Sequence, residues 1–129
     1  MPVGIVGSGQ LAGMLAEAAQ KMGLELHLQA SDPDDAAVAL AAAAVFGPSE
    51  NGDATAQLAK QCRRIGFENE WVDLEAIQAL EVEGVEFQPC AEVLAQVVDK
   101  RQQRNLLERL NLPSPGWCDL ATVVSAGGK

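Results

Sequence analysis

Basic residues are scarce in this sequence. Nine Lys and Arg residues stand against eighteen Asp and Glu residues, which gives a formal net charge of −9. A nucleic-acid partner is therefore not expected, because neutralising phosphates requires a basic surface. The shortage is uneven, since residues 1–98 hold four of the basic residues and residues 99–129 hold five. This change in charge balance marks a candidate boundary near residue 99.

Metal ligands and potential disulfide partners are also few. Cys62, Cys90 and Cys118 form no C-x-x-C pair, and His27 is the only histidine. We therefore expect no metal site and no disulfide framework, and reduced thiols fit a cytoplasmic protein. No basic region precedes the first apolar stretch, and no apolar run reaches the roughly 18 residues typical of a membrane span. Neither a secretory signal nor a membrane partner is expected.

Aromatic residues make up only 4% of the chain, whereas 48% of the residues are hydrophobic and alanine is abundant. This composition suits helices packed closely on a sheet better than a β-sandwich. Short apolar runs alternate with segments of helical spacing, and the runs lie near residues 2–7, 24–30, 44–46, 65–67 and 85–89. Such alternation predicts an α/β fold, with a Rossmann-like parallel sheet and helices on both faces.

Local patterns refine this prediction. Leucine, methionine and alanine recur at helical spacing in the first helix, at Leu11, Met14, Leu15, Ala18 and Met22. In the stretch 24–30, leucines alternate with Glu25, His27 and Gln29, which predicts a strand with one better-solvated side. Three acidic residues are expected to cap the later helices, namely Asp53, Asp73 and Asp99.

The charge boundary also separates two predicted domains. Residues 1–98 are predicted to form the Rossmann-like domain. Residues 99–129 are predicted to form a linker helix and the beginning of a truncated second domain, because they hold too little apolar material for a core of their own. The last residues contain one possible strand and a glycine-rich end.

A glycine-rich turn follows the first predicted strand and opens the first predicted helix. Its sequence is Gly7-Ser8-Gly9-Gln10-Leu11-Ala12. Glycines let a backbone approach a ligand closely, and a helix start presents free N–H groups that favour an anion. A bound phosphate or carboxylate is one interpretation, and a tight connection without a ligand is the other. The G-x-G-x-x-A spacing together with Asp32 also leaves NAD binding open.

The segment GIVGSGQLAGMLAEAAQKMGLELHL resembles the N-terminal part of the 5-(carboxyamino)imidazole ribonucleotide synthetase family, within the ATP-grasp superfamily. Three later stretches agree in order: Asp32-Pro33, Phe67-Glu68-Asn69, and DKRQQRNLLERLNLPSP from Asp99. The likeness covers nearly the whole chain. It implies a pre-ATP-grasp domain followed by the start of an incomplete ATP-grasp domain.

This resemblance implies an ATP-dependent ligase of purine biosynthesis. Such an enzyme carboxylates aminoimidazole ribonucleotide with bicarbonate while ATP is cleaved, with magnesium in the ATP site. By matching position, the substrate-binding residues are Gly7, Ser8, Gly9, Gln10, Leu11 and Glu68. Lys100 aligns with an arginine that contacts ATP phosphate. The family commonly pairs its subunits, so a homodimer is possible.

The sequence also departs from the family pattern. Gly13 stands where arginine is usual, Gly66 replaces an acidic residue, and Lys100 keeps the charge of arginine without its bidentate geometry. The family's later ATP and magnesium ligands do not occur in these 129 residues. We therefore expect this chain alone to lack catalytic residues, bound ATP and magnesium, and activity. A non-catalytic domain that only dimerises is a further alternative.

Overall fold

The computed structural model of the protein describes residues 1–120. The chain divides into two compact units, Met1–Leu94 and Ala95–Lys129. The first unit contains a five-stranded sheet, and the second contains helix α5 (Lys100–Arg109).

All strand pairs of the sheet are parallel. The strands lie in the order β3-β2-β1-β4-β5, so the chain moves outward from β1 and then returns to the other side of it. Their bounds are β1 Val3–Val6, β2 Leu26–Ala30, β3 Ala43–Phe46, β4 Arg64–Phe67 and β5 Glu86–Gln88. The predicted Rossmann-like parallel sheet is confirmed.

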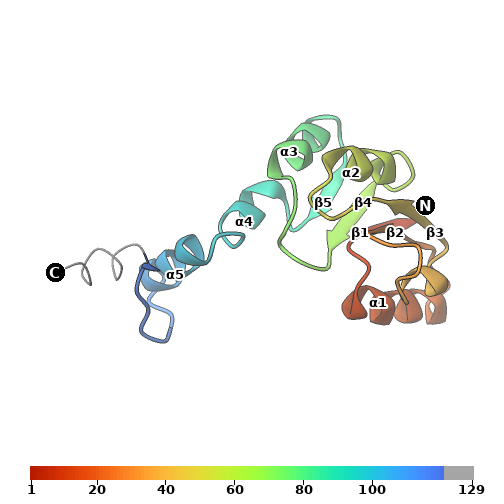
Figure 1. Ribbon diagram of the computed structural model, residues 1–129. Coiled ribbons are helices and arrows are strands. Elements are labelled where there is room, and N and C mark those ends of the chain that lie inside the picture. The colour runs from red at the N-terminus through yellow and green to blue at the C-terminus, as the bar shows by residue number, and fades with distance from the viewer. Residues whose placement is uncertain (121–129) are drawn as a thin grey trace. The chain divides into compact units, whose positions relative to one another are not determined.

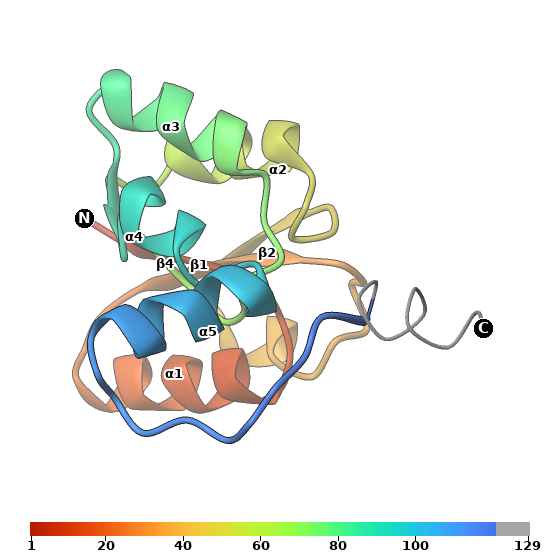
Figure 2. The same ribbon diagram turned by 90° about the vertical axis from the view of Figure 1, so that its left-hand side faces the viewer.

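Helices cover both faces of this sheet, as predicted (Figures 1 and 2). Helix α1 and the short 3₁₀ helix η1 lie together on one face, and α2 and α3 pack against each other on the opposite face. A short helix, α4, follows β5. The bounds are α1 Gln10–Lys21, η1 Val38–Leu40, α2 Gly52–Ala59, α3 Leu74–Val82 and α4 Ala91–Ala95.

The buried face of α1 is not the face that its large apolar residues mark. Ala12, Ala16 and Ala19 are buried in the core, where they join Ile5, Leu26 and Leu28 from the strands. Leu11, Met14, Leu15 and Met22 are instead exposed in the first unit. Helix α1 therefore carries two apolar stripes, one of alanines and one of larger residues. The small alanine side chains let the helix pack closer to the sheet, because the large side chains of the strands fill the space between helix and sheet.

The second face of β2 is covered at Gln29, although the alternation predicted that this face would be better solvated, as it is at half-buried His27. Gln29 is only 1% exposed. Its side chain donates to the carbonyl oxygens of Pro48 at 2.7 Å and Asn51 at 3.3 Å, and accepts from Thr55 Oγ1 at 2.8 Å. These bonds replace the lost hydration, which is what burial of an amide requires.

Helix caps follow the prediction at two of three places. Asp73 accepts a hydrogen bond from Ala76 N in α3, and Asp99 accepts one from Gln102 N in α5. The cap of α2 is Asn51, which accepts from Ala54 N, so the prediction of Asp53 was wrong. Asp53 lies in the first turn of the helix instead. The possible strand predicted near the C-terminus falls on residues 121–129, outside the described residues.

Candidate functional site

The glycine turn lies at the carboxyl edge of the sheet, where the strand order reverses. It follows β1, whose neighbours are β2 on one side and β4 on the other. Gly7 has φ of +123°, a conformation that favours glycine, and its N–H donates to Gln29 O at 3.0 Å. Ligands of open parallel sheets bind at such reversal points. The sequence-predicted turn is therefore placed where the fold class favours a site.

Glu68 comes to the same point from the neighbouring strand. Its backbone N–H donates to Val6 O at 2.9 Å, which continues the pairing of β4 with β1. Its carboxylate accepts hydrogen bonds from Gly9 N at 2.6 Å and Leu11 N at 3.2 Å. A negative charge at a helix N-terminus is favourable. The structure thus brings together two features that lie about sixty positions apart in the sequence.

These hydrogen bonds change the interpretation of the turn. The backbone amides of Gly9 and Leu11 were predicted to be available to a ligand, but they donate to the carboxylate of Glu68. The helix cap residue, Gly9, has no side chain to accept a bond. Glu68 therefore supplies the cap from another strand.

A second polar network joins the turn to the loop after β2. Ser8 Oγ donates to Asp35 Oδ2 and accepts from Ser31 N at 3.3 Å. Asp35 Oδ2 also accepts from Asp32 N at 3.1 Å. No sequence pattern predicts this role of Asp35, because only the fold brings the turn at residues 7–9 beside it.

Asp32 has a local role in the same loop. Its Oδ1 accepts from Asp34 N at 2.9 Å, so the side chain closes its own turn. A dinucleotide site requires an acid at this point to bind a ribose hydroxyl. The local bond gives the Asp-Pro step a structural explanation that needs no ribose.

Gln10 begins α1 and is exposed. It lines a groove of about 450 Å³ between the start of α1 and the segment 35–40, and Gly13, Met14 and Glu17 also line it. An added Cβ at Gly13 lies 3.9 Å from Ala37, which is an ordinary contact. The groove therefore includes position 13, where the family that the chain resembles usually has arginine.

The loop after β4 continues the polar edge. Asn69 Oδ1 accepts from Trp71 N at 3.0 Å, and Asn69 Nδ2 reaches Ser49 Oγ at 3.5 Å. Trp71 is 69% exposed. The Asn69–Ser49 contact connects the loops that follow β3 and β4.

Lys100 belongs to the second unit, where it is the first residue of α5. It lines a pocket of about 490 Å³ with Arg101, Arg104 and Trp117. Arg101 pairs with Asp119 at 3.2 Å, and Arg104 donates to Ser114 Oγ at 2.9 Å. Asp99 and Asp119 also line the pocket, so its basic side chains outnumber its acidic ones by three to two.

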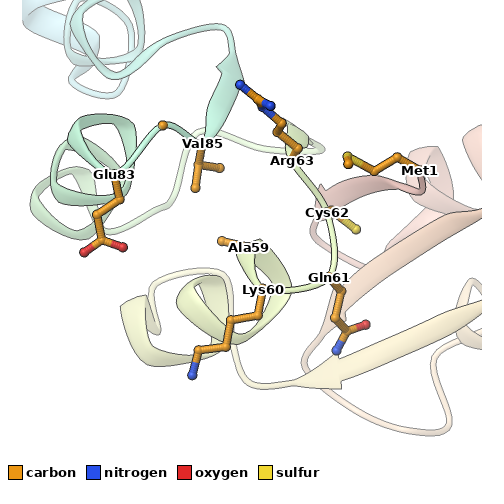
Figure 3. A pocket seen from close by; sticks show the side chains of 9 residues that line it. Met1, Ala59, Lys60, Gln61, Cys62, Arg63, Glu83 and Val85 are labelled. Carbon is orange, nitrogen blue, oxygen red and sulfur yellow. The ribbon is translucent and has the colours of Figure 1, made fainter.

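Another pocket lies at the opposite, amino edge of the sheet (Figure 3). Lys60 and Arg63 line it but extend in different directions (Figure 3), and Arg63 approaches Glu86 at 3.7 Å. Cys62 is buried there, and burial raises the pKa of its thiol to about 11. A thiol that stays protonated is a poor nucleophile. This pocket brings no reactive groups together.

Residues 1–120 contain neither a metal-binding cluster nor a membrane-spanning helix. No group of three or more His, Cys, Asp or Glu side chains there is arranged to hold a metal ion. None of the helices in that range combines the length and apolar composition needed to cross a bilayer.

Comparison with known proteins identifies relatives along the whole chain. The family model for the ribonucleotide synthetase preATP-grasp domain matches residues 1–98. The N5-carboxyaminoimidazole ribonucleotide synthase of Synechococcus elongatus is 46% identical over 123 residues, which cover 95% of this chain and 31% of that protein. The chain therefore spans about a third of the length of this curated relative.

Solved structures agree with this relationship. The N5-carboxyaminoimidazole ribonucleotide synthetase of Thermotoga maritima matches with a TM-score of 0.79 at 25% identity, over 98% of this chain and 36% of that one. The N5-carboxyaminoimidazole synthase of Aspergillus clavatus, in complex with ADP and 5-aminoimidazole ribonucleotide, matches with a TM-score of 0.78 at 28% identity. That match covers 87% of this chain and 30% of the other.

Proposed function

Because the chain belongs to the ribonucleotide synthetase preATP-grasp domain family, we propose that it is the N-terminal, substrate-binding part of an ATP-dependent ligase. The proposed reaction carboxylates 5-aminoimidazole ribonucleotide with bicarbonate in purine biosynthesis. The observation that carries the proposal is the meeting of the glycine turn with Glu68 where the strand order reverses. Relatives whose names state this synthase activity support it.

The proposed ribonucleotide contacts are the turn Gly7-Ser8-Gly9-Gln10-Leu11 and Glu68. The Gln10 amide is exposed at the mouth of the groove, where it can donate to a phosphate or a ribose oxygen. Glu68 can accept a hydrogen bond from an amine. Since Gly9 and Leu11 donate to Glu68, a phosphate that takes these amides requires the carboxylate to turn away.

Lys100 is the proposed contact to ATP phosphate. The pocket at the start of α5 supports this role, because Lys100, Arg101 and Arg104 outnumber Asp99 and Asp119 in its lining. For magnesium the residues do not fit, since no acidic cluster suited to a metal ion occurs among residues 1–120. We therefore propose no magnesium ligand in this part of the protein.

The chain alone is proposed to be inactive. The synthetases it resembles are about three times as long, and closing a site around ATP requires groups on more than one element. A cytoplasmic location and pairing of subunits through the full-length protein belong to the same proposal. The comparisons favour the synthetase over a dinucleotide-binding module.

Calorimetric titration with 5-aminoimidazole ribonucleotide tests the substrate assignment. We expect binding to the 129-residue chain, and we expect Gln10→Ala to weaken it by about tenfold, the loss of roughly one hydrogen bond to a charged group. Gln57→Ala is the matched control, because Gln57 is exposed on α2. Equal affinity in Gln10→Ala and Gln57→Ala, or no binding at millimolar ligand, would contradict the assignment.

A further inference from the structure

Glu68 fills the space that side chains at the turn would need. A Cβ added at Gly9 would overlap Glu68 Oε1, and one added at Gly7 would lie 2.6 Å from Glu68 Oε2. Both approaches are well below a normal contact between carbon and oxygen. Side chains at positions 7 and 9 therefore compete with the carboxylate for one volume.

The backbone conformations separate the two glycines. Gly7 has φ of +123°, which favours glycine whatever surrounds it. Gly9 has φ of −79° and ψ of −159°, an extended conformation that any residue adopts. The three heavy atoms nearest to a Cβ at Gly9 all belong to Glu68. The backbone at position 9 does not require glycine, but the Glu68 carboxylate can keep its observed position only if no Cβ is present there.

We propose that Glu68 is a positioning residue, and that Gly9 is glycine in order to admit its carboxylate. The carboxylate joins the end of β4 to the start of α1 by accepting from the amides on either side of Gln10. This clamp fixes the first turn of α1 and so the starting point of the Gln10 side chain. In many glycine-rich turns a ligand approaches the backbone closely, and here the Glu68 carboxylate occupies that position.

This inference goes beyond the proposed function, because the clamp operates without a ligand. Its test uses the 129-residue chain and no substrate. A failed test therefore leaves the substrate assignment standing, and a failed substrate titration leaves the clamp standing.

A double-mutant cycle between positions 9 and 68 tests the clamp. Gly9→Ala displaces the carboxylate and Glu68→Ala removes it, so each single variant loses the same hydrogen bonds. We expect each to raise the unfolding equilibrium constant in urea by about tenfold, the loss of charge-assisted bonds. In the Glu68→Ala background, Gly9→Ala should have little further effect. Additive effects in the double variant, or an unaffected Gly9→Ala protein, would overturn the proposal.

Gly7→Ala is the matched control for the cycle. Its positive φ is unfavourable for alanine whether or not the carboxylate is present. A Cβ at Gly7 also lies 2.7 Å from the Cβ of residue 68, which Glu68→Ala retains, so most of the effect should persist in the Glu68→Ala background. Glu25→Ala controls for the loss of one negative charge at an exposed site. If Gly9→Ala alone fails to fold, recovery of the fold in the Gly9→Ala, Glu68→Ala protein supports the clamp, and failure of both overturns it.

Amide NMR provides a readout that a general loss of stability would not change. A hydrogen bond to a carboxylate shifts an amide proton to higher frequency. The Leu11 amide proton should therefore move to lower frequency by a similar amount in folded Gly9→Ala and folded Glu68→Ala. A Leu11 resonance that stays in place in either variant would show that the carboxylate is not its acceptor.

Discussion

The side chain of Gln29 illustrates how a polar residue becomes part of the interior. Alternation along the strand placed it correctly on the face opposite Leu28, but periodicity carries no information on what covers that face. Helix α2 does so through Thr55, whose hydroxyl donates to Gln29 Oε1 at 2.8 Å. A buried amide with three partners is stable where an unpaired one is not. The residue pattern predicts the face, and the tertiary fold decides its exposure.

Cys62 is expected to give the stability of the protein a specific pH dependence. Burial raises its pKa from 9.0 to about 11. Below pH 9 the thiol is protonated in both states, so this contribution to stability is fully present. As pH rises from about 9 to 11, the unfolded state loses its proton first, and the free energy of unfolding falls.

Urea unfolding between pH 8 and 11 measures this effect. Cys62→Ala should lower stability at pH 8, where the packing of the buried side chain is lost, and its stability should fall less steeply with rising pH than that of the unmodified protein. Cys90→Ala, at an exposed position, is the control and should keep the original slope.

A thiol reagent should label Cys90 and Cys118 in the folded protein and Cys62 only after unfolding. Rapid native labelling of Cys62, or an unchanged slope in Cys62→Ala, would contradict the prediction.

At the scale of single elements, the N-terminus of α2 provides a direct comparison of two candidate caps. Asn51 accepts from Ala54 N at 3.1 Å, whereas Asp53 lies inside the first turn. Asn51→Ala should destabilise the protein by about 1 kcal/mol, the usual effect of losing such a cap. Asp53→Ala should cost only about 0.3–1 kcal/mol, because it loses only an interaction with the helix dipole. Chemical unfolding compares the two, and a larger loss in Asp53→Ala would be the contrary result.

Helix α1 shows how far element-level prediction reaches. Its existence and its start beside the glycine turn follow from the sequence, because capping and spacing are local properties. Its buried face does not, since Leu11 and Met14 form an apolar stripe as regular as that of Ala12 and Ala16. The choice depends on the distance between helix and sheet, which the strand residues Ile5 and Leu28 determine from across the core.

The candidate site could be predicted in parts but not as a unit. The resemblance to the family predicts Gln10 and Glu68 as site residues, and the glycines predict the turn. The hydrogen bonds from Gly9 and Leu11 to Glu68 could not be predicted, because they require β1 and β4 to be neighbours. Strand order is a long-range property that no local pattern contains. Asp35 was missed for the same reason.

At the scale of the whole molecule, the arrangement of the first unit explains why the polar residues around the candidate site gather at one edge. Every strand of the sheet is parallel, so the loops after β1, β2, β3 and β4 all emerge at the carboxyl edge. Ser8, Asp35, Ser49, Glu68 and Asn69 come from these four loops. The opposite edge holds Cys62 and the pocket of Figure 3, and there no reactive groups converge. The parallel sheet thus brings polar side chains together at one edge, whatever ligand they bind.

The proposed boundary after residue 98 can be tested by truncation. The family model ends there, and α5 buries none of its side chains. A chain of residues 1–98 should therefore unfold at the same urea concentration as the 129-residue chain, because area removed from water supplies most of the folding free energy. A chain ending at residue 84 is the control: it loses β5 with buried Phe87, as well as buried Leu94, and should unfold at lower urea. A marked loss of stability in residues 1–98 would mean that the segment after residue 98 is part of the first folding unit.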